Sequence, residues 1–195
     1  MDFQNSQTKD NLMRAFAGES QARNRYMFAY QKAMSMHLYV LAELFKFTAK
    51  QEEAHAKIFY EHLMEMSGQT ISVDGTYPVD LYDDMASILE AANHNENEEA
   101  HDVYPAFAEI AKSEGFKKIA LDFENIAKIE DEHAKRFEKY ACLMQDGELF
   151  RCDDSNQQWA CLYCGHVHTG VMAPKTCPVC MHEQGHFIRT EVLEG

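Results

Sequence analysis

The chain has 195 residues, 46% of them hydrophobic, which is enough for one full domain and a small second one. Its formal net charge of −14 argues against a nucleic-acid surface or an anionic membrane as a partner. No segment approaches the roughly 20 apolar residues of a membrane span. The start of the sequence lacks the basic and apolar regions of a signal peptide, so we expect a cytoplasmic protein.

The first three quarters of the sequence show strong helical periodicity with few breaking residues. The breaks fall near residues 35–38, at residues 67–78 and at Gly115. They divide this region into four segments of roughly 27 to 32 residues each, the pattern of a helical bundle. We therefore expect one helical domain over residues 1–145.

The remainder of the chain has a different composition. Residues 146–157 are polar and acidic without a helical stripe, and we expect them to form a linker. Residues 158–195 are rich in glycine, cysteine and turn residues. This last segment is too short to be stabilised by an apolar core alone, so it requires another source of stability.

Two of the predicted helices carry charged residues on their core-facing stripe. In the fourth helix every position of that stripe is apolar or aromatic except Glu130 and His133, and the second helix repeats the pattern with Glu52 and His55. Residues three apart lie on one face of a helix. Each pair therefore points into the core, where an unpaired charge costs several kcal/mol.

The other two helices supply further carboxylates to the same layer. Glu19 precedes Glu52 by 33 residues and Glu96 precedes Glu130 by 34, so the two halves of the bundle are an internal repeat. One Glu-x-x-His pair usually marks a solvated helix face, but two pairs in register with the core stripe favour metal ligands. Four such helices packed together predict a carboxylate-bridged di-iron or di-manganese site.

The third helix carries one carboxylate more than this set requires. Its stripe runs through Glu96 and Glu99 and continues to Val103 and Ile110. Oxygen ligands with imidazole suit iron or manganese. The surplus Glu99 gives one metal a choice between Glu99 and His55, which predicts ligand exchange when the redox state changes.

Two tyrosines are expected near the ligand layer. Tyr26 and Tyr104 are placed by their helical positions to hydrogen-bond the carboxylates. Ordinary aromatic packing explains the same positions equally well.

Two C-x-x-C pairs in the last segment predict a second metal site. Their cysteines, separated by twelve residues between the pairs, form a four-thiolate set: Cys161, Cys164, Cys177 and Cys180. In a reducing compartment this spacing favours a metal over disulfides. The spacing leaves the metal open between zinc for a structural ribbon and iron for electron transfer.

Beyond these patterns, the sequence resembles the rubrerythrin family over nearly its whole length. The resemblance is carried by four helix segments and by a rubredoxin-like tail, at residues 15–26, 48–59, 104–115, 129–137 and 159–180. It implies a mainly α fold: a four-helix ferritin-like bundle followed by a small rubredoxin-like four-cysteine metal-binding domain with short β-strands.

The resemblance also implies a function. Rubrerythrins are non-haem di-iron peroxidases that reduce hydrogen peroxide to water in defence against oxidative stress. Electrons pass through a rubredoxin-type iron, which zinc can replace, from an NAD(P)H-linked reductase or a small electron carrier. The family forms homodimers or higher homo-oligomers that bring the tail of one subunit near the di-iron site of another. The alternative is a ferritin-like ferroxidase or iron-handling protein with a structural zinc ribbon.

The family's ligand roles carry over to matching positions. The bridging carboxylates match Glu52 and Glu130, the terminal ones match Glu19 and Glu96, and the fixed histidine matches His133. Glu99 and His55 match the pair between which one iron moves on oxidation and reduction. One departure is Met181, which follows Cys180 where rubredoxin tends to have glycine. This change can alter an N–H···S contact but leaves the ligand set intact.

Overall fold

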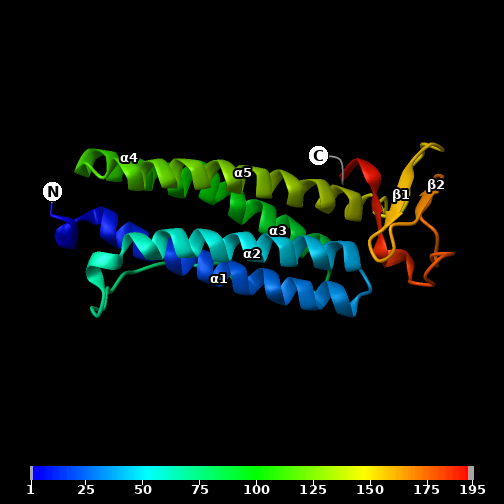
Figure 1. The fold of residues 1–195 in the computed structure, drawn as a ribbon, viewed down its shortest axis with the longest axis horizontal. Coiled ribbons are helices and arrows are strands. Elements are labelled where there is room, and N and C mark those ends of the chain that lie inside the picture. The colour runs from blue at the N-terminus through cyan, green and yellow to red at the C-terminus, as the bar shows by residue number, and fades with distance from the viewer. Residues whose placement is uncertain (1, 193–195) are drawn as a thin grey trace.

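The computed structural model describes residues 2–192, which form a long helical bundle with a small sheet at one end (Figure 1). The first half of the bundle consists of α1 (Gln7–Ser35) and α2 (Tyr39–His62). Ser6 caps the N-terminus of α1: its side chain accepts a hydrogen bond from the Lys9 N–H at 3.1 Å. Within residues 2–192, no helix is long and apolar enough to cross a membrane.

The second half is one long helix with an irregular turn, followed by a straight helix. α3 (Met85–Glu98) runs through a π-helical turn, η3 (Glu99–Val103), directly into α4 (Tyr104–Glu114), and α5 (Lys117–Gln145) returns beside them. Gly115 ends α4 in a left-handed conformation with φ 92°. The predicted mainly helical four-helix fold is confirmed.

The π-helical turn corrects the predicted core stripe of the third helix. The prediction placed Val103 and Ile110 in the core, but both are half-buried. Their C-terminal neighbours Tyr104 and Ala111 are fully buried instead. A π turn inserts one residue into the helix, so every later core position moves along by one.

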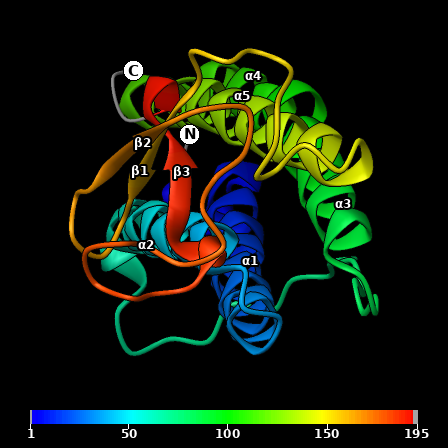
Figure 2. The same ribbon diagram turned by 90° about the vertical axis from the view of Figure 1, so that its right-hand side faces the viewer.

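The two helix pairs are joined by a long crossover segment, residues 67–84. α2 ends at one end of the bundle and α3 begins at the other, so this segment must travel the length of the bundle alongside α1 (Figures 1 and 2). It contains no helix or strand. Asp84 caps the N-terminus of the next helix, α3. Its side chain accepts a hydrogen bond from the Ser87 N–H at 2.8 Å.

The core of the bundle consists of two apolar clusters. One lies toward the sheet end and contains Phe45 stacked on Phe137, with ring centroids 5.3 Å apart. The other lies toward the opposite end and contains Phe59 stacked on Phe123, at 5.0 Å. The buried glutamates and histidines occupy helix positions between these clusters, so apolar residues surround a polar layer at mid-bundle.

The C-terminal residues form a three-stranded antiparallel sheet in the order β2-β1-β3. Its strands are β1 (Gln158–Cys161), β2 (Val167–Thr169) and β3 (Phe187–Arg189). Trp159 is fully buried in a small cluster with Phe187. Its Nε1–H donates to the Gly170 carbonyl at 2.8 Å. The predicted small domain with short strands is confirmed.

This C-terminal sheet domain packs against the turn between α1 and α2. Glu183 lies 2.7 Å from His37 Nδ1, and the His186 ring stacks on Tyr39 with centroids 3.9 Å apart. A Cβ on Gly185 would lie 1.8 Å from the His37 carbonyl oxygen, so only glycine fits this contact. The sheet domain is therefore held at one end of the bundle (Figure 1).

Candidate metal centres

The structure brings six of the predicted ligands together in the buried mid-bundle layer. Their donor atoms form two groups, each within 4.8 Å: Glu19, Glu52, His55 and Glu130, and Glu52, Glu96, Glu130 and His133. The two groups share Glu52 and Glu130. Every one of the six side chains is buried.

The shared carboxylates span both groups. Glu130 Oε1 lies 2.9 Å from His55 Nδ1, and Glu130 Oε2 lies 2.8 Å from His133 Nδ1. Glu52 does the same, with Oε2 at 3.2 Å from His55 and Oε1 at 3.1 Å from His133. Each carboxylate therefore presents one oxygen to each half of the layer, which is the geometry of a bridging ligand.

The two remaining glutamates each belong to one half. Glu19 Oε2 lies 3.7 Å from His55 Nδ1, and Glu96 Oε2 lies 3.4 Å from His133 Nδ1. The two imidazole rings are 5.8 Å apart and nearly parallel. The internal repeat of the sequence thus becomes two similar half-sites.

The donor atoms of this layer fit two metal ions. Among the described residues, several of them are buried without a hydrogen-bond partner: Glu19 Oε2, Glu52 Oε1, Glu96 Oε2, both oxygens of Glu130, and His133 Nδ1. Four buried carboxylates that share only two imidazoles are strongly unfavourable. Two cations placed among them would satisfy these atoms, and oxygen with imidazole is a ligand set for iron or manganese.

Each of the two tyrosines hydrogen-bonds a glutamate that belongs to only one half-site. The Tyr26 hydroxyl donates to Glu96 and the Tyr104 hydroxyl donates to Glu19. Burial raises the pKa of both hydroxyls well above the ordinary value, and the carboxylate partner of each adds to the rise. Both tyrosines therefore stay protonated as donors, besides packing against neighbouring rings such as Phe137, 5.2 Å from Tyr26.

Gln51 is a contact of the site that the sequence analysis did not include. Its Oε1 lies 3.1 Å from His133 Nε2 and also accepts from Arg136 Nη1 at 3.3 Å. Because the Gln51 oxygen can only accept a hydrogen bond, Nε2 of His133 must carry the proton. Nδ1 of His133 is then free to bind a metal. Among the described residues, no comparable partner holds Nε2 of His55. A half-buried glutamine beside a ligand has no distinctive sequence pattern.

Glu99 lies at the edge of the cluster. It is half-buried, begins the π-helical turn, and does not belong to either group of donor atoms within 4.8 Å. Burial, followed by the charges of Glu96 and Glu130, raises the pKa of Glu99 well above its ordinary value. Its neighbour Glu98 is exposed, as the helical phase predicts.

We expect metal binding to the bundle to release protons. In the metal-free layer, burial and the charge of Glu52 raise the pKa of Glu96 to about 8. Burial lowers the pKa of His133, but the close carboxylates of Glu130 and Glu52, 2.8 and 3.1 Å from Nδ1, outweigh it and raise that pKa to about 12. Both groups hold protons at pH 7, whereas ligands must be deprotonated.

The sign of the pH dependence follows from these protonated groups. Metal affinity should fall as pH falls, and a pH indicator in weak buffer should record at least one proton released per chain at pH 7. Uptake of two metals without proton release would contradict these protonation states.

The four cysteines of the C-terminal domain also converge. Their sulfurs lie within 4.8 Å of one another, with Cys161 to Cys180 and Cys164 to Cys177 both at 3.7 Å. A tetrahedral ion with metal–sulfur bonds of about 2.3 Å requires sulfur–sulfur distances of about 3.8 Å. The four thiols are therefore spaced to hold one metal.

Each C-x-x-C pair turns through a left-handed residue. Gly165, with φ 76°, donates its N–H to the Cys161 carbonyl at 2.8 Å. Met181, with φ 63°, does the same to Cys177 at 3.0 Å. Met181, which stands where rubredoxin tends to have glycine, thus forms the same turn. A residue with a side chain is less favourable than glycine in this left-handed conformation.

Comparisons with known proteins agree with this arrangement. The Rubrerythrin family model matches residues 10–141, and the model for the rubrerythrin, rubredoxin-like domain matches residues 159–188. Rubrerythrin-1 of Clostridium acetobutylicum is 40% identical over 184 residues, covering 93% of each chain.

Solved structures share the fold. Nigerythrin in its fully reduced, all-ferrous state superposes with a TM-score of 0.62 at 26% identity, covering 95% of this chain and 90% of its own. The bacterioferritin of Desulfovibrio desulfuricans, solved with its diiron site in different catalytic states, has a TM-score of 0.64 at 25% identity. That match covers 72% of this chain and 81% of the bacterioferritin.

Proposed function

Because this chain belongs to the rubrerythrin family of oxidoreductases, we propose that it is a non-haem di-iron peroxidase that reduces hydrogen peroxide to water in defence against oxidative stress. The bundle has a ferritin-like di-iron site, and the C-terminal domain has a rubredoxin-like four-cysteine site. The observation that carries the proposal is the buried layer in which Glu52 and Glu130 each face both half-sites.

The side chains of the layer have distinct roles in this proposal. When bound, two irons supply Lewis acidity and electrons for breaking an O–O bond. Glu52 and Glu130 would hold both metals, because each presents one oxygen to each half-site. Tyr26 and Tyr104 orient the terminal carboxylates, and their hydroxyls keep protons one hydrogen bond away from those carboxylates. Reduction of peroxide to water consumes two protons, so buried donors at this position are useful.

We further propose that Glu99 and His55 exchange at one of the half-sites when the redox state changes. Gln51 holds the ring of His133, whereas His55 has no such partner among the described residues. Glu99 stands at the π-helical turn beside the cluster, and such turns are frequent at functional sites. His133 is thus the better-anchored of the two histidines.

Glu99→Ala is expected to slow peroxide turnover roughly 10- to 100-fold, the range found when groups that tune a metal site are removed. It should also shift the reduction potential of the bundle metals, because a negative ligand stabilises their oxidised state. Glu109→Ala is the matched control, since Glu109 is an exposed carboxylate on the same continuous α3–α4 helix. Wild-type turnover and potential in Glu99→Ala would show that no exchange occurs.

Electrons would reach the bundle through the four-cysteine site, from an NAD(P)H-linked reductase or a small electron carrier. Within one chain the path is long, because α1 alone extends 16 residues from Glu19 to Ser35, a rise of roughly 24 Å. We therefore propose a homodimer or higher homo-oligomer in which the C-terminal domain of one subunit approaches the metal layer of another. None of the six cysteines forms a disulfide, which fits a cytoplasmic location.

The rival function is iron handling by a ferritin-like ferroxidase with a structural zinc ribbon. Anaerobic titration of reduced, iron-reconstituted protein with peroxide separates the two. The peroxidase consumes peroxide in proportion to its ferrous iron and remains a small oligomer on a sizing column. Assembly into a cage that accumulates ferric mineral, with peroxide left unconsumed, would overturn the proposal.

A further inference from the structure

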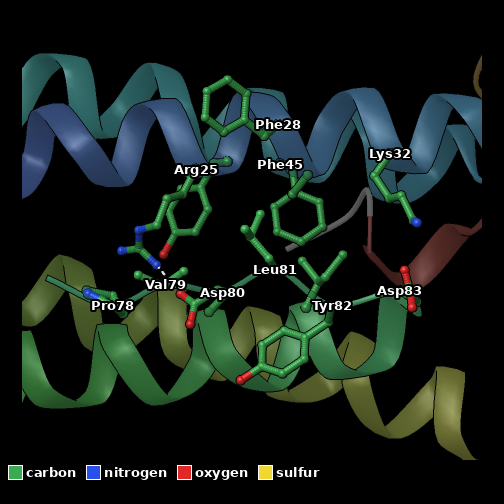
Figure 3. Close-up of a pocket in the computed structure, with 14 residues that line it drawn as sticks. Arg25, Phe28, Lys32, Phe45, Pro78, Val79, Asp80, Leu81, Tyr82 and Asp83 are labelled. Carbon is green, nitrogen blue, oxygen red and sulfur yellow. Dashed lines mark hydrogen bonds and ion pairs between the residues drawn. The ribbon is translucent and has the colours of Figure 1, made fainter.

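The crossover segment is fastened to the bundle at two points. Arg14 Nη2 lies 2.6 Å from Asp74 Oδ1, and Arg14 Nε donates to the Asp74 carbonyl. Arg25 Nη1 lies 2.5 Å from Asp80 Oδ2, and Asn95 Nδ2 donates to the same oxygen at 2.8 Å. Figure 3 shows the Arg25–Asp80 pair on the segment where it runs between α1 and α3. Residues 74–80 are therefore tied to both sides of the groove that they cross.

A cavity of about 620 Å³ lies beneath the first part of this tied segment. We call it the access chamber. Its walls come from α1, from the α3–α4 helix and from residues 74–78. Its lining includes Gly18, Glu99 and Tyr104, the first adjacent to the ligand Glu19 and the last hydrogen-bonded to it. The chamber therefore leads from the crossover segment to the Glu99 side of the metal layer.

A second cavity lies on the other side of the Arg25–Asp80 pair. It has a volume of about 510 Å³ and is bordered by apolar side chains that include Phe28, Phe45 and Leu81 (Figure 3). None of the six clustered Glu and His ligands lines either cavity, and the second cavity approaches the layer at Tyr26, the partner of Glu96, rather than at Glu99. Its more apolar border makes it the poorer route for a polar molecule.

The lining of the access chamber is more polar than that of the second cavity, but it carries no unpaired positive charge. Its two arginines are paired with Asp74 and Asp80, and the other charged groups on its wall are Glu98 and Glu99. An anion would meet these carboxylates without a free cation. The buried amide nitrogen of Asn11, a lining residue, has no hydrogen-bond partner among the described residues. These features suit a small, neutral molecule that accepts hydrogen bonds.

Tyr77 narrows the access chamber from the side of the crossover segment. A Cβ placed on Gly18 would lie 3.8 Å from the Tyr77 ring, and the Tyr77 hydroxyl donates to the Arg14 carbonyl at 3.4 Å. The ring therefore lies against α1 one residue from the ligand Glu19. A bulky molecule would have to displace it.

We propose that the access chamber is the site through which hydrogen peroxide reaches the metal layer, and that the Tyr77 ring limits the size of the hydroperoxides admitted. This inference rests on the proposed peroxidase function. In this inference, the crossover segment selects hydrogen peroxide over larger organic hydroperoxides.

The test compares Tyr77→Ala with Tyr82→Ala in reduced, iron-reconstituted full-length protein. Both tyrosines lie on the crossover segment with similar exposure, 42% and 47%, but Tyr82 borders the second cavity. The rates of reaction with hydrogen peroxide and with cumene hydroperoxide are measured by stopped flow. We expect wild type to prefer hydrogen peroxide by about tenfold or more. Tyr77→Ala should reduce this ratio about tenfold, and Tyr82→Ala should leave it unchanged.

A second measurement does not depend on peroxidase activity. The rate at which metal-free protein takes up cobalt(II) should rise in Tyr77→Ala and stay at the wild-type value in Tyr82→Ala. Equal uptake in all three proteins would overturn the access role of the chamber, as would a wild type that reacts equally fast with both hydroperoxides. A wild type that reacts with neither, yet shows the expected difference in uptake, would refute the peroxidase function alone.

Discussion

Glu130→Gln is expected to lose both metals of the bundle, although the substitution changes the side chain by one atom and keeps its volume. The reason is that each carboxylate oxygen of Glu130 lies within 3 Å of a different histidine nitrogen, at 2.9 and 2.8 Å. An amide offers one oxygen and no negative charge, so it cannot bridge two cations. Removing an outer contact of a metal ligand costs about 10- to 100-fold in affinity. Loss of a shared ligand should exceed that in both half-sites.

Glu132→Gln is the matched control for this experiment. Glu132 is on the same helix, but its side chain is exposed and paired with Lys135. Metal content by elemental analysis should fall from two ions per bundle toward none in Glu130→Gln and remain at two in Glu132→Gln. Retention of two tightly bound ions by Glu130→Gln would contradict a bridging role.

Cys177→Ala is expected to unfold the C-terminal domain while the bundle keeps its metals. The apolar cluster of this domain is small and built around Trp159 and Phe187, with Ala173 and three buried cysteines as its other members. A metal held by such a domain contributes about 10–16 kcal/mol to folding in comparable zinc-binding peptides. Cys177 is fully buried and is one of the four convergent thiols. Its loss removes both the metal and part of the core.

The chain offers a direct optical readout of this effect. Trp159 is the single tryptophan and is fully buried, so its fluorescence reports the C-terminal domain alone. Cys177→Ala should shift that emission to the red and abolish the visible absorption of an iron–tetrathiolate centre. Cys142→Ala, which alters an exposed thiol on α5, should change neither. A blue, native emission in Cys177→Ala would mean that the domain folds without its metal.

The bundle and its charged layer were predictable because both follow from local periodicity. Glu52 and His55 interrupt an apolar stripe, and Glu130 and His133 repeat that interruption, so the sequence itself marks where charges are buried. The two C-x-x-C pairs are equally local. In each case a spacing of three residues determines which side chains share a face or a turn.

Features that depend on contacts between distant segments could not be predicted in this way. The π-helical turn at Glu99–Val103 moves Tyr104 and Ala111 into the core, and no residue type marks such an insertion. The contact of Gln51 with His133 joins α2 to α5 and depends on how the helices pack. The close approach of Gly185 to the His37 carbonyl likewise exists only once the C-terminal domain has docked.

One measurement tests most directly the claim that peroxide is reduced at the bundle site with electrons from the four-cysteine centre. Iron-reconstituted, fully reduced protein is mixed in an anaerobic stopped-flow instrument with peroxide and, separately, with oxygen. The visible absorption of the oxidised iron–tetrathiolate centre is followed. We expect rapid, stoichiometric oxidation by peroxide, much slower oxidation by oxygen, and no rapid phase in Glu130→Gln. A centre that never gains this absorption, or that oxidises equally fast in Glu130→Gln, would contradict electron delivery to the bundle.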